Sequence, residues 1–179
     1  NTAAKAGVSA ALHDLVGKRL GVPVWRLWGL DPGAAPLSSF TIGIDELEAM
    51  REKVREAASY PILKIKVGGW KDVETLRAVR EASQAQLWVD ANEAFSVDEA
   101  VEVVAELKEI GVGMIEQPVP ASAGPEALGR VTEEASPVPV MADESSIEAS
   151  DVPRLAGYVG GVNVKLAKCG GIRGALKMI

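Results

Sequence analysis

The chain has few of the residues that build several common kinds of site. Its 179 residues include one cysteine and one histidine, and only 4% of them are aromatic. A single cysteine, Cys169, excludes an intramolecular disulfide framework. Beside Gly170 and Gly171, it is interpreted as a small packing residue rather than a nucleophile. His13 falls in an expected helix and is interpreted as a packed or capping histidine.

Long apolar runs and common catalytic signatures are also missing. No apolar run reaches the roughly 18 residues that a membrane span needs. The segment "GYVGG" lacks the Lys-Ser/Thr of a phosphate loop, and no G-x-S-x-G elbow occurs. The net charge of −6 argues against a nucleic-acid surface. We therefore expect a cytoplasmic protein without nucleic-acid or membrane partners.

What is present is a regular alternation of short apolar segments and amphipathic segments. With 47% hydrophobic residues, the chain is long enough for one domain with a sizeable core. Such alternation favours an α/β fold with a parallel sheet. The expected strands are 37–42, 62–67, 86–90, 112–116, 138–142 and 161–165. The expected helices are 2–20, 45–59, 72–83, 97–110, 124–135 and 150–156, with another from 171.

The spacing of the strands indicates the kind of α/β fold. Ionisable residues end five successive strands, and the gaps between them are 24, 26, 27 and 22 residues. A unit of this length fits a (β/α)₈ TIM-type barrel better than an open doubly wound sheet. Six units are present, so we expect a piece of a longer protein that lacks units seven and eight. Residues 1–36 are expected to form a helical end and connection, and residues 37–179 a partial barrel.

The ionisable strand ends predict a site. In such a barrel, the carboxyl ends of all strands open on the face that carries the chemistry. Asp90, Glu116 and Asp143 would converge there and need a cation. A set of oxygen ligands suits a hard divalent ion, of which Mg²⁺ is the best candidate. Asn92 and Glu144 are expected to support these ligands through hydrogen bonds.

Lysines stand on both sides of the carboxylates in the sequence. Lys64 and Lys66 share one face of the strand "ILKIKV", and Lys165 ends the sixth strand. Approach from opposite sides of a bound ligand would suit proton transfer by two bases. A nearby metal and a second ammonium would each lower the pKa of a lysine from its usual value near 10.4 toward a useful range. Lys64 is expected to assist Lys66 and to contact a substrate carboxylate.

Several of these segments together resemble a known family. The segments "LKIKVG", "VDANEAF", "IEQPV", "ADES" and "VNVKLAKCGG" occur in the order and spacing of the enolase superfamily, in its muconate-lactonising subgroup. "ALHDLVGKRLGVPVWRLWG" resembles the helix that leads from the capping domain of that family. "FTIGID" and "NVKLAKCGG" look most like the dipeptide (L-Ala-D/L-Glu) epimerases.

The resemblance implies removal of a proton α to a carboxylate of a small substrate, with Mg²⁺ as cofactor. By match, Lys66 and Lys165 are the acid and base, and Lys64 is their helper. The metal ligands are Asp90, Glu116 and Asp143. A dipeptide is the expected substrate, and a homo-oligomer is expected for the full-length protein. Muconate cycloisomerases and the N-succinylamino-acid racemase/o-succinylbenzoate synthase group share these residues and remain alternatives.

Two hypotheses of other classes also stay open. A Schiff-base aldolase could use Lys165, although imine chemistry needs no metal site and leaves the carboxylates unexplained. Alternatively, the chain could be a truncated fragment that keeps the residues without activity. The residues of the eighth strand and of the capping domain, which read the substrate in the family, lie outside this chain.

Overall fold

The computed structural model describes residues 1–179, which divide into two compact units. The first unit combines residues 1–36, 147–153 and 164–179, and the second combines residues 37–146 and 154–163. In this division the N-terminal segment ends at residue 36, and the C-terminal segment groups with the N-terminal helix. The assignment of residues 37–179 to one catalytic domain stays a prediction.

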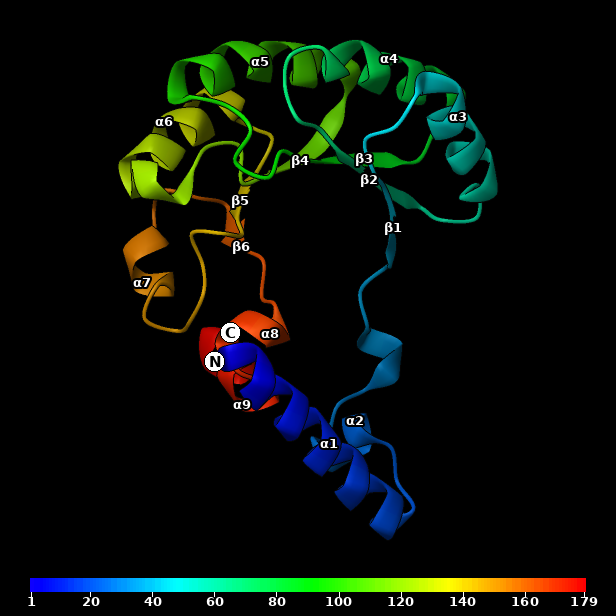
Figure 1. Cartoon of the computed structure of the whole chain (residues 1–179), viewed down its shortest axis with the longest axis vertical. Helices are drawn as coiled ribbons and strands as arrows, with labels where there is room; N and C mark the ends of the chain where they lie inside the picture. The colour runs from blue at the N-terminus through cyan, green and yellow to red at the C-terminus, as the bar shows by residue number, and fades with distance from the viewer. The chain divides into compact units, whose positions relative to one another are not determined.

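The second unit contains a six-stranded sheet in which every strand runs parallel to its neighbours (Figure 1). The order is β1-β2-β3-β4-β5-β6, so each βα unit adds the next strand at the same edge. The predicted α/β class and the six units of a barrel-type fold are confirmed. The strands are β1 (Ser39–Ile42), β2 (Ile62–Lys66), β3 (Gln86–Asp90), β4 (Val112–Glu116), β5 (Val140–Ala142) and β6 (Gly161–Val162).

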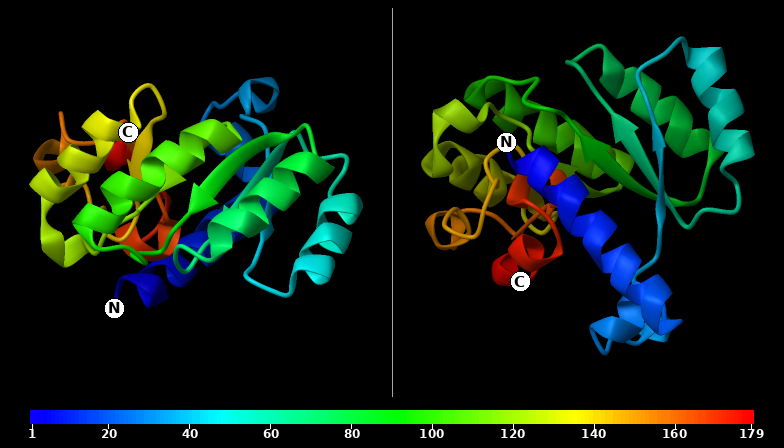
Figure 2. Two further views of the ribbon diagram at one scale, coloured as in Figure 1. Left: turned by 90° about the horizontal axis from the view of Figure 1, so that it is seen from above. Right: turned by 60° about the horizontal axis from the view of Figure 1, so that its bottom comes forward.

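Helices cover one face of this sheet, as the two further views also show (Figure 2). Their amphipathic faces and the strand residues that point toward them form one apolar core, as expected for a parallel sheet. Leu63, Ile65, Leu87, Val89 and Ile115 are the strand residues at its centre, each at most 1% exposed. The helices are α3 (Leu47–Glu56), α4 (Asp72–Ala82), α5 (Val97–Ile110), α6 (Pro125–Ala135) and α7 (Val152–Leu155), with the 3₁₀ turn η2 (Ala121–Ala123).

The opposite face of the sheet is hollow. Side chains that alternate with the core residues line a cavity of about 490 Å³, with Trp88, Met114 and Met141 among them. Lys64 and Glu116 also line this cavity. The alternation of a strand therefore separates an apolar core face from a face that carries the ionisable side chains.

The pairing of β3 with β4 contains one irregularity. Leu87 pairs with Val112, but the next residue, Trp88, pairs with Met114. Gly113 is therefore an extra residue in β4, as in a β-bulge. A side chain there would crowd its neighbour, because an added Cβ would lie 2.8 Å from Nε2 of Gln86.

Two helix starts that look alike in the sequence differ in the structure. At α5, Ser96 and Glu99 form a reciprocal capping box. At α3, Asp45 and Glu48 have the same spacing, which predicts a second capping box, but none forms. The N-cap of α3 is Glu46, which makes no side-chain capping bond. Asp45 instead accepts a bond from the Glu46 amide at 2.9 Å and pairs with Lys53 at 2.8 Å, so its carboxylate is already occupied.

The first unit is helical. Its C-terminal helices pack on the N-terminal half of α1, where Gly171 has a φ of 108° and an added Cβ would lie 2.7 Å from Oγ of Ser9. His13 stacks on Trp28 with ring centroids 5.5 Å apart, which agrees with a packed histidine. The elements are α1 (Thr2–Leu20), α2 (Val24–Leu27), η1 (Pro32–Ala34), α8 (Leu166–Cys169) and α9 (Ile172–Met178).

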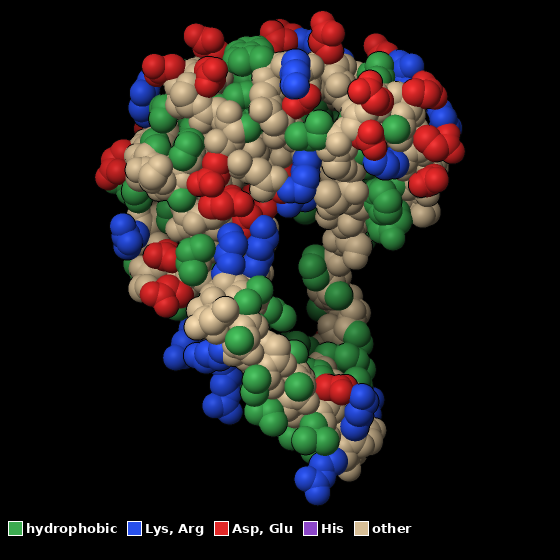
Figure 3. Space-filling view, viewed as in Figure 1, with side chains coloured by type: hydrophobic (Ala, Val, Ile, Leu, Met, Phe, Trp, Pro, Cys, Tyr) green, Lys and Arg blue, Asp and Glu red, His purple; other side chains and the backbone are tan.

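The surface differs between elements (Figure 3). Aspartate and glutamate side chains gather over the helices of the second unit, whereas apolar side chains follow the exposed side of α1. The exposed apolar residues of α1 are Val8, Leu12, Leu15, Val16 and Leu20. No helix of the structure combines the length and apolarity that a membrane crossing requires.

Candidate active site at the carboxyl ends of the strands

The two lysines of β2 have partners, which explains their place in a buried strand. Nζ of Lys64 lies 3.0 Å from Oδ2 of Asp90 and 2.8 Å from Oε2 of Glu116. Nζ of Lys66 lies 3.3 Å from the same Asp90 oxygen. The Lys64 side chain is only 16% exposed, and an unpaired ammonium at such depth would cost several kcal/mol. The carboxylates of β3 and β4 therefore permit charge in β2.

The same contacts decide the protonation of Lys64. Burial by itself would lower the pKa of this ammonium, but hydrogen bonds with Glu116 and Asp90 outweigh the burial and raise its pKa above the ordinary value. Lys64 is thus a firmly charged group. That suits a helper that attracts a substrate carboxylate better than it suits a base.

Asp90 and Glu116 are brought together by strand pairing. They are register partners at the last positions of β3 and β4, and they are 1% and 2% exposed. Oε1 of Glu116 also accepts a bond from Nδ2 of Asn163 at 2.8 Å. Asn163 follows β6, where its amide bonds the Ala142 carbonyl. Asn163 is not among the residues predicted for the site, although it is a polar residue inside the apolar segment "GVNVK".

Asn92 connects three charged residues of the site. Its Oδ1 accepts a hydrogen bond from Lys66, and its backbone amide donates to Oδ1 of Asp90 at 3.2 Å. Its Nδ2 lies 3.4 Å from Oε1 of Glu144, whose other carboxylate oxygen is buried without a hydrogen-bond partner. Asn92 has a φ of 43°, in the left-handed region. This conformation, which asparagine tolerates better than most residues, turns the side chain toward Lys66.

Asp143 is fully buried one residue beyond the end of β5. Its backbone amide donates to Oε1 of Gln117 at 2.8 Å. Gln117 follows Glu116 directly, so the two neighbouring strand ends are joined by a side chain. Gln117 is not among the residues predicted for the site, although "EQPV" places a polar residue next to apolar ones.

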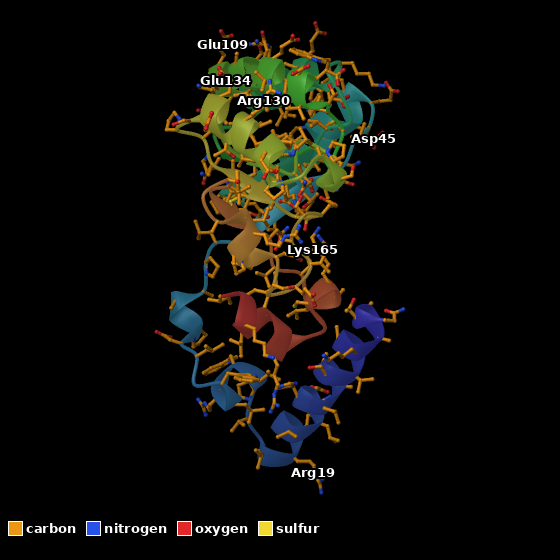
Figure 4. All side chains as sticks on the ribbon, turned by 90° about the vertical axis from the view of Figure 1, so that its left-hand side faces the viewer. Arg19, Asp45, Glu109, Arg130, Glu134 and Lys165 are labelled. Atoms are coloured by element: carbon orange, nitrogen blue, oxygen red, sulfur yellow. The ribbon has the colours of Figure 1, made fainter.

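Lys165 belongs to the other compact unit, where it lies directly before α8 (Figure 4). The sequence predicts it at the end of a five-residue strand, but β6 ends at Val162. That prediction of the strand is wrong because only Gly161 and Val162 pair with β5. The role of Lys165 as an acid or base stays a prediction.

The donor set matches a hard divalent cation in kind. Asp90, Glu116 and Asp143 offer only oxygen, they are buried, and they come from three adjacent strand ends. In this structure, the Lys64 ammonium supplies positive charge between the first two. No three His, Cys, Asp or Glu side chains are gathered closely enough to enclose a metal ion. The residues thus fit Mg²⁺ by chemistry, and as metal ligands they remain a proposal.

Two family descriptions match the chain. Residues 46–179 match the enolase C-terminal domain-like family. Residues 1–29 match the N-terminal domain of the mandelate racemase and muconate lactonizing enzymes. Together these matches include the helical start of the chain and all strands from β2 onward.

Curated relatives agree with this assignment. The L-Ala-D/L-Glu epimerase of Bacteroides thetaiotaomicron is 44% identical over 181 residues, which cover 100% of this chain and 47% of that protein. The hydrophobic dipeptide epimerase of Enterococcus faecalis is 36% identical, over 98% of this chain and 51% of that protein. The chain therefore spans about half the length of the curated relatives that it matches.

Solved structures are similar over nearly the whole chain. The Enterococcus faecalis dipeptide epimerase, complexed with Mg and the dipeptide L-Leu-L-Tyr, has a TM-score of 0.89 at 36% identity and covers 99% of this chain and 51% of that chain. The muconate lactonizing enzyme of Pseudomonas fluorescens, complexed with muconolactone, has a TM-score of 0.91 at 31% identity, covering 99% and 50%. With both family matches, these likenesses show that the chain belongs to the enolase superfamily, in its muconate-lactonizing branch.

Proposed function

We propose that this chain carries the proton-transfer residues of a Mg²⁺-dependent dipeptide epimerase, with L-Ala-D/L-Glu as the model substrate. The observation that carries the proposal is the cluster of Lys64, Lys66, Asp90 and Glu116 at the ends of β2, β3 and β4. Its contacts join two ammonium groups to two buried carboxylates. The similarity to curated dipeptide epimerases supports the choice of substrate class.

In this proposal, Lys66 and Lys165 are the acid and base on opposite sides of the substrate α-carbon. Lys66 is better placed than Lys64 to exchange a proton, because its side chain is 38% exposed and Asn92 orients it. Each lysine would remove the α-proton from one stereoisomer and return a proton to the other. Lys64 stays charged and attracts the substrate carboxylate.

Asp90, Glu116 and Asp143 would hold the metal. Mg²⁺, when bound, would polarise the substrate carboxylate and so make the α-proton more acidic. The buried position of the three side chains limits competition from water for the ion. Lys64 then neutralises part of the charge that the carboxylates bring together.

The test uses the complete gene product that contains this chain. Proton NMR in D₂O would follow both isomers of L-Ala-Glu with the parent, Lys66→Ala, Lys165→Ala and the matched control Lys108→Ala, a lysine on α5 that bonds the Glu134 carbonyl. Loss of either catalytic lysine should slow epimerisation by about 10²–10⁴-fold, the usual contribution of an acid or base. Each variant should still exchange the α-proton of one isomer, and the preferred isomers should be opposite. Near-parental epimerisation by Lys165→Ala would refute the two-base proposal.

Cycloisomerisation of muconate is the second candidate, favoured by the TM-score of 0.91 to a muconate lactonizing enzyme. It would use the same lysines and carboxylates on a different substrate. Assaying the parent protein with cis,cis-muconate beside a panel of dipeptides separates the two. Turnover of muconate without epimerisation of any dipeptide would replace the first proposal with the second.

A further inference from the structure

Gln117 has an unusual position for an uncharged polar residue. Its side chain is completely buried and its φ is 37°. A left-handed backbone at a residue other than glycine costs about 1–2 kcal/mol, and such conformations cluster at functional sites. The proposed ligand Glu116 comes directly before it. Gln117 therefore lies where strand β4 gives way to the site.

Every hydrogen-bonding position of this side chain is used. Oε1 accepts from the amides of Asp143 at 2.8 Å and Ser145 at 3.1 Å. Nε2 donates to the Val119 carbonyl at 2.8 Å and to Oγ of Ser145 at 2.9 Å. A glutamine has two acceptor and two donor positions, so none is left over. The reverse orientation of the amide would set an NH₂ group against two backbone N–H groups, which fixes the orientation.

The strands alone hold Asp143 poorly. Only two residue pairs join β4 to β5, Ile115 with Val140 and Glu116 with Met141. The backbone amide of Gln117 adds one more bond, to the Met141 carbonyl at 2.9 Å. Beyond Ala142, the strand has ended. The side chain of Gln117 therefore continues the connection between the two strand ends where the sheet no longer provides it.

We propose that Gln117 is a positioning residue that holds Asp143, through its backbone amide, beside the end of β4 that carries Glu116, so that both carboxylates can serve one metal ion. The inference rests on the proposed metal site and names a residue that acts on it without touching the ion. Loss of groups that orient metal ligands commonly weakens metal binding by about 10–100-fold. That size of effect is expected on removal of the Gln117 amide.

The experiment measures Mg²⁺ binding by calorimetry in the complete gene product. Gln117→Met keeps the length of the side chain and removes all four hydrogen bonds, so Mg²⁺ should bind about 10–100-fold more weakly. The Mg²⁺ concentration that half-activates turnover should rise in parallel, while kcat at saturating Mg²⁺ recovers. Ser145→Ala, which leaves the Asp143 bond intact, should weaken binding less. Val131→Ala, a truncation in the core of α6, should lower thermal stability without changing Mg²⁺ affinity.

If Gln117→Met does not fold, Gln117→Asn replaces it, because its shorter side chain cannot span Asp143 and Val119 together. Affinity within about twofold of the parent in the folded variant would overturn the inference, since a loss of about tenfold or more is expected. Asp90→Asn and Asp143→Asn separate the two levels of the argument. If they leave Mg²⁺ binding unchanged, the metal site and the inference both fail. If they abolish it while the Gln117 variant binds normally, only the inference fails.

Discussion

The two faces of the sheet differ in chemical character although they belong to the same strands. The face toward the helices is wholly apolar, with Leu87, Val89 and Ile115 buried among aliphatic neighbours. The other face ends in buried charge. All three non-glycine residues with positive φ, namely Asn92, Glu93 and Gln117, lie just beyond the ends of β3 and β4. Departures from ideal folding chemistry thus gather at the candidate site, where function rather than stability explains them.

The largest expected effect comes from removing one charge on the face of the sheet that carries the ionisable side chains. Ile115 and Glu116 are consecutive in β4 and point to opposite faces. Glu116→Gln keeps the shape and the acceptor for Asn163 but removes the charge. Mg²⁺ binding should fall by more than about 100-fold, beyond the loss typical of residues that only orient ligands, and epimerisation should stop. Calorimetry and the NMR assay measure this, and intact metal binding would show that Glu116 is not a ligand.

Ile115, the residue before Glu116, tests the apolar face that packs against the helices. Ile115→Ala should lower the free energy of unfolding by about 2–5 kcal/mol, because it leaves a cavity in the core. Urea denaturation measures the loss. The Mg²⁺ affinity of the protein that remains folded should be unchanged. A large fall in affinity would mean that the two faces are not independent.

A smaller effect concerns the left-handed backbone near the site. Glu93 has a φ of 66°, and its carboxylate accepts a bond from the Ala121 amide. Glu93→Ala and Glu93→Gly both lose this bond, but only glycine adopts the conformation without strain. The glycine variant should therefore be more stable than the alanine variant by about 1 kcal/mol. Equal stabilities in urea would show that the backbone relaxes to negative φ.

The smallest expected effect lies on the helical side and depends on pH. Hydrogen bonds from the Ser96 hydroxyl and amide lower the pKa of Glu99 from its ordinary value near 4.5. The stabilisation is therefore present above that value and is lost as the pH falls through the lower pKa of the folded state. Glu99→Gln should melt below the parent at neutral pH and converge with it in acid. Ser96→Ala should cost about 1 kcal/mol through loss of the cap.

Much of the fold could be predicted from local patterns. Strands β3 and β4 have the predicted bounds, because each is a short apolar run that ends in a carboxylate. Strand β6 was predicted too long, since "GVNVK" looks extended but only two of its residues meet a partner strand. Pairing is a property of two segments, and one segment does not reveal where it stops. The capping box predicted at α3 is absent for a similar reason, because the Asp45 carboxylate pairs with Lys53 instead.

The residues of the candidate site likewise divide into those that could be predicted from the sequence and those that could not. The ionisable residues could be found because charge at the end of an apolar strand is conspicuous. Gln117 and Asn163 were missed because both are uncharged and act through bonds to residues 26 and 47 positions away. Their importance comes from burial and complete hydrogen bonding, which only the fold displays.

The extra residue in β4 has a consequence for insertions and deletions. Val112 faces the core, and without the irregularity at Gly113 every second residue after it would do so too, including Met114 and Glu116. Gly113 absorbs that shift, so Met114 and Glu116 face the cavity. A homologue that lacked only Gly113 would have a regular β4 strand in which Met114 and Glu116 still face the cavity. Loss of Met114 or Ile115 alone would also leave four residues from Val112 to the glutamate, and regular alternation of those four would still turn the glutamate toward the cavity. A gap of one residue between Val112 and Glu116 therefore keeps the glutamate on its face of the sheet, whereas the same gap in a strand without an extra residue would move it to the other face.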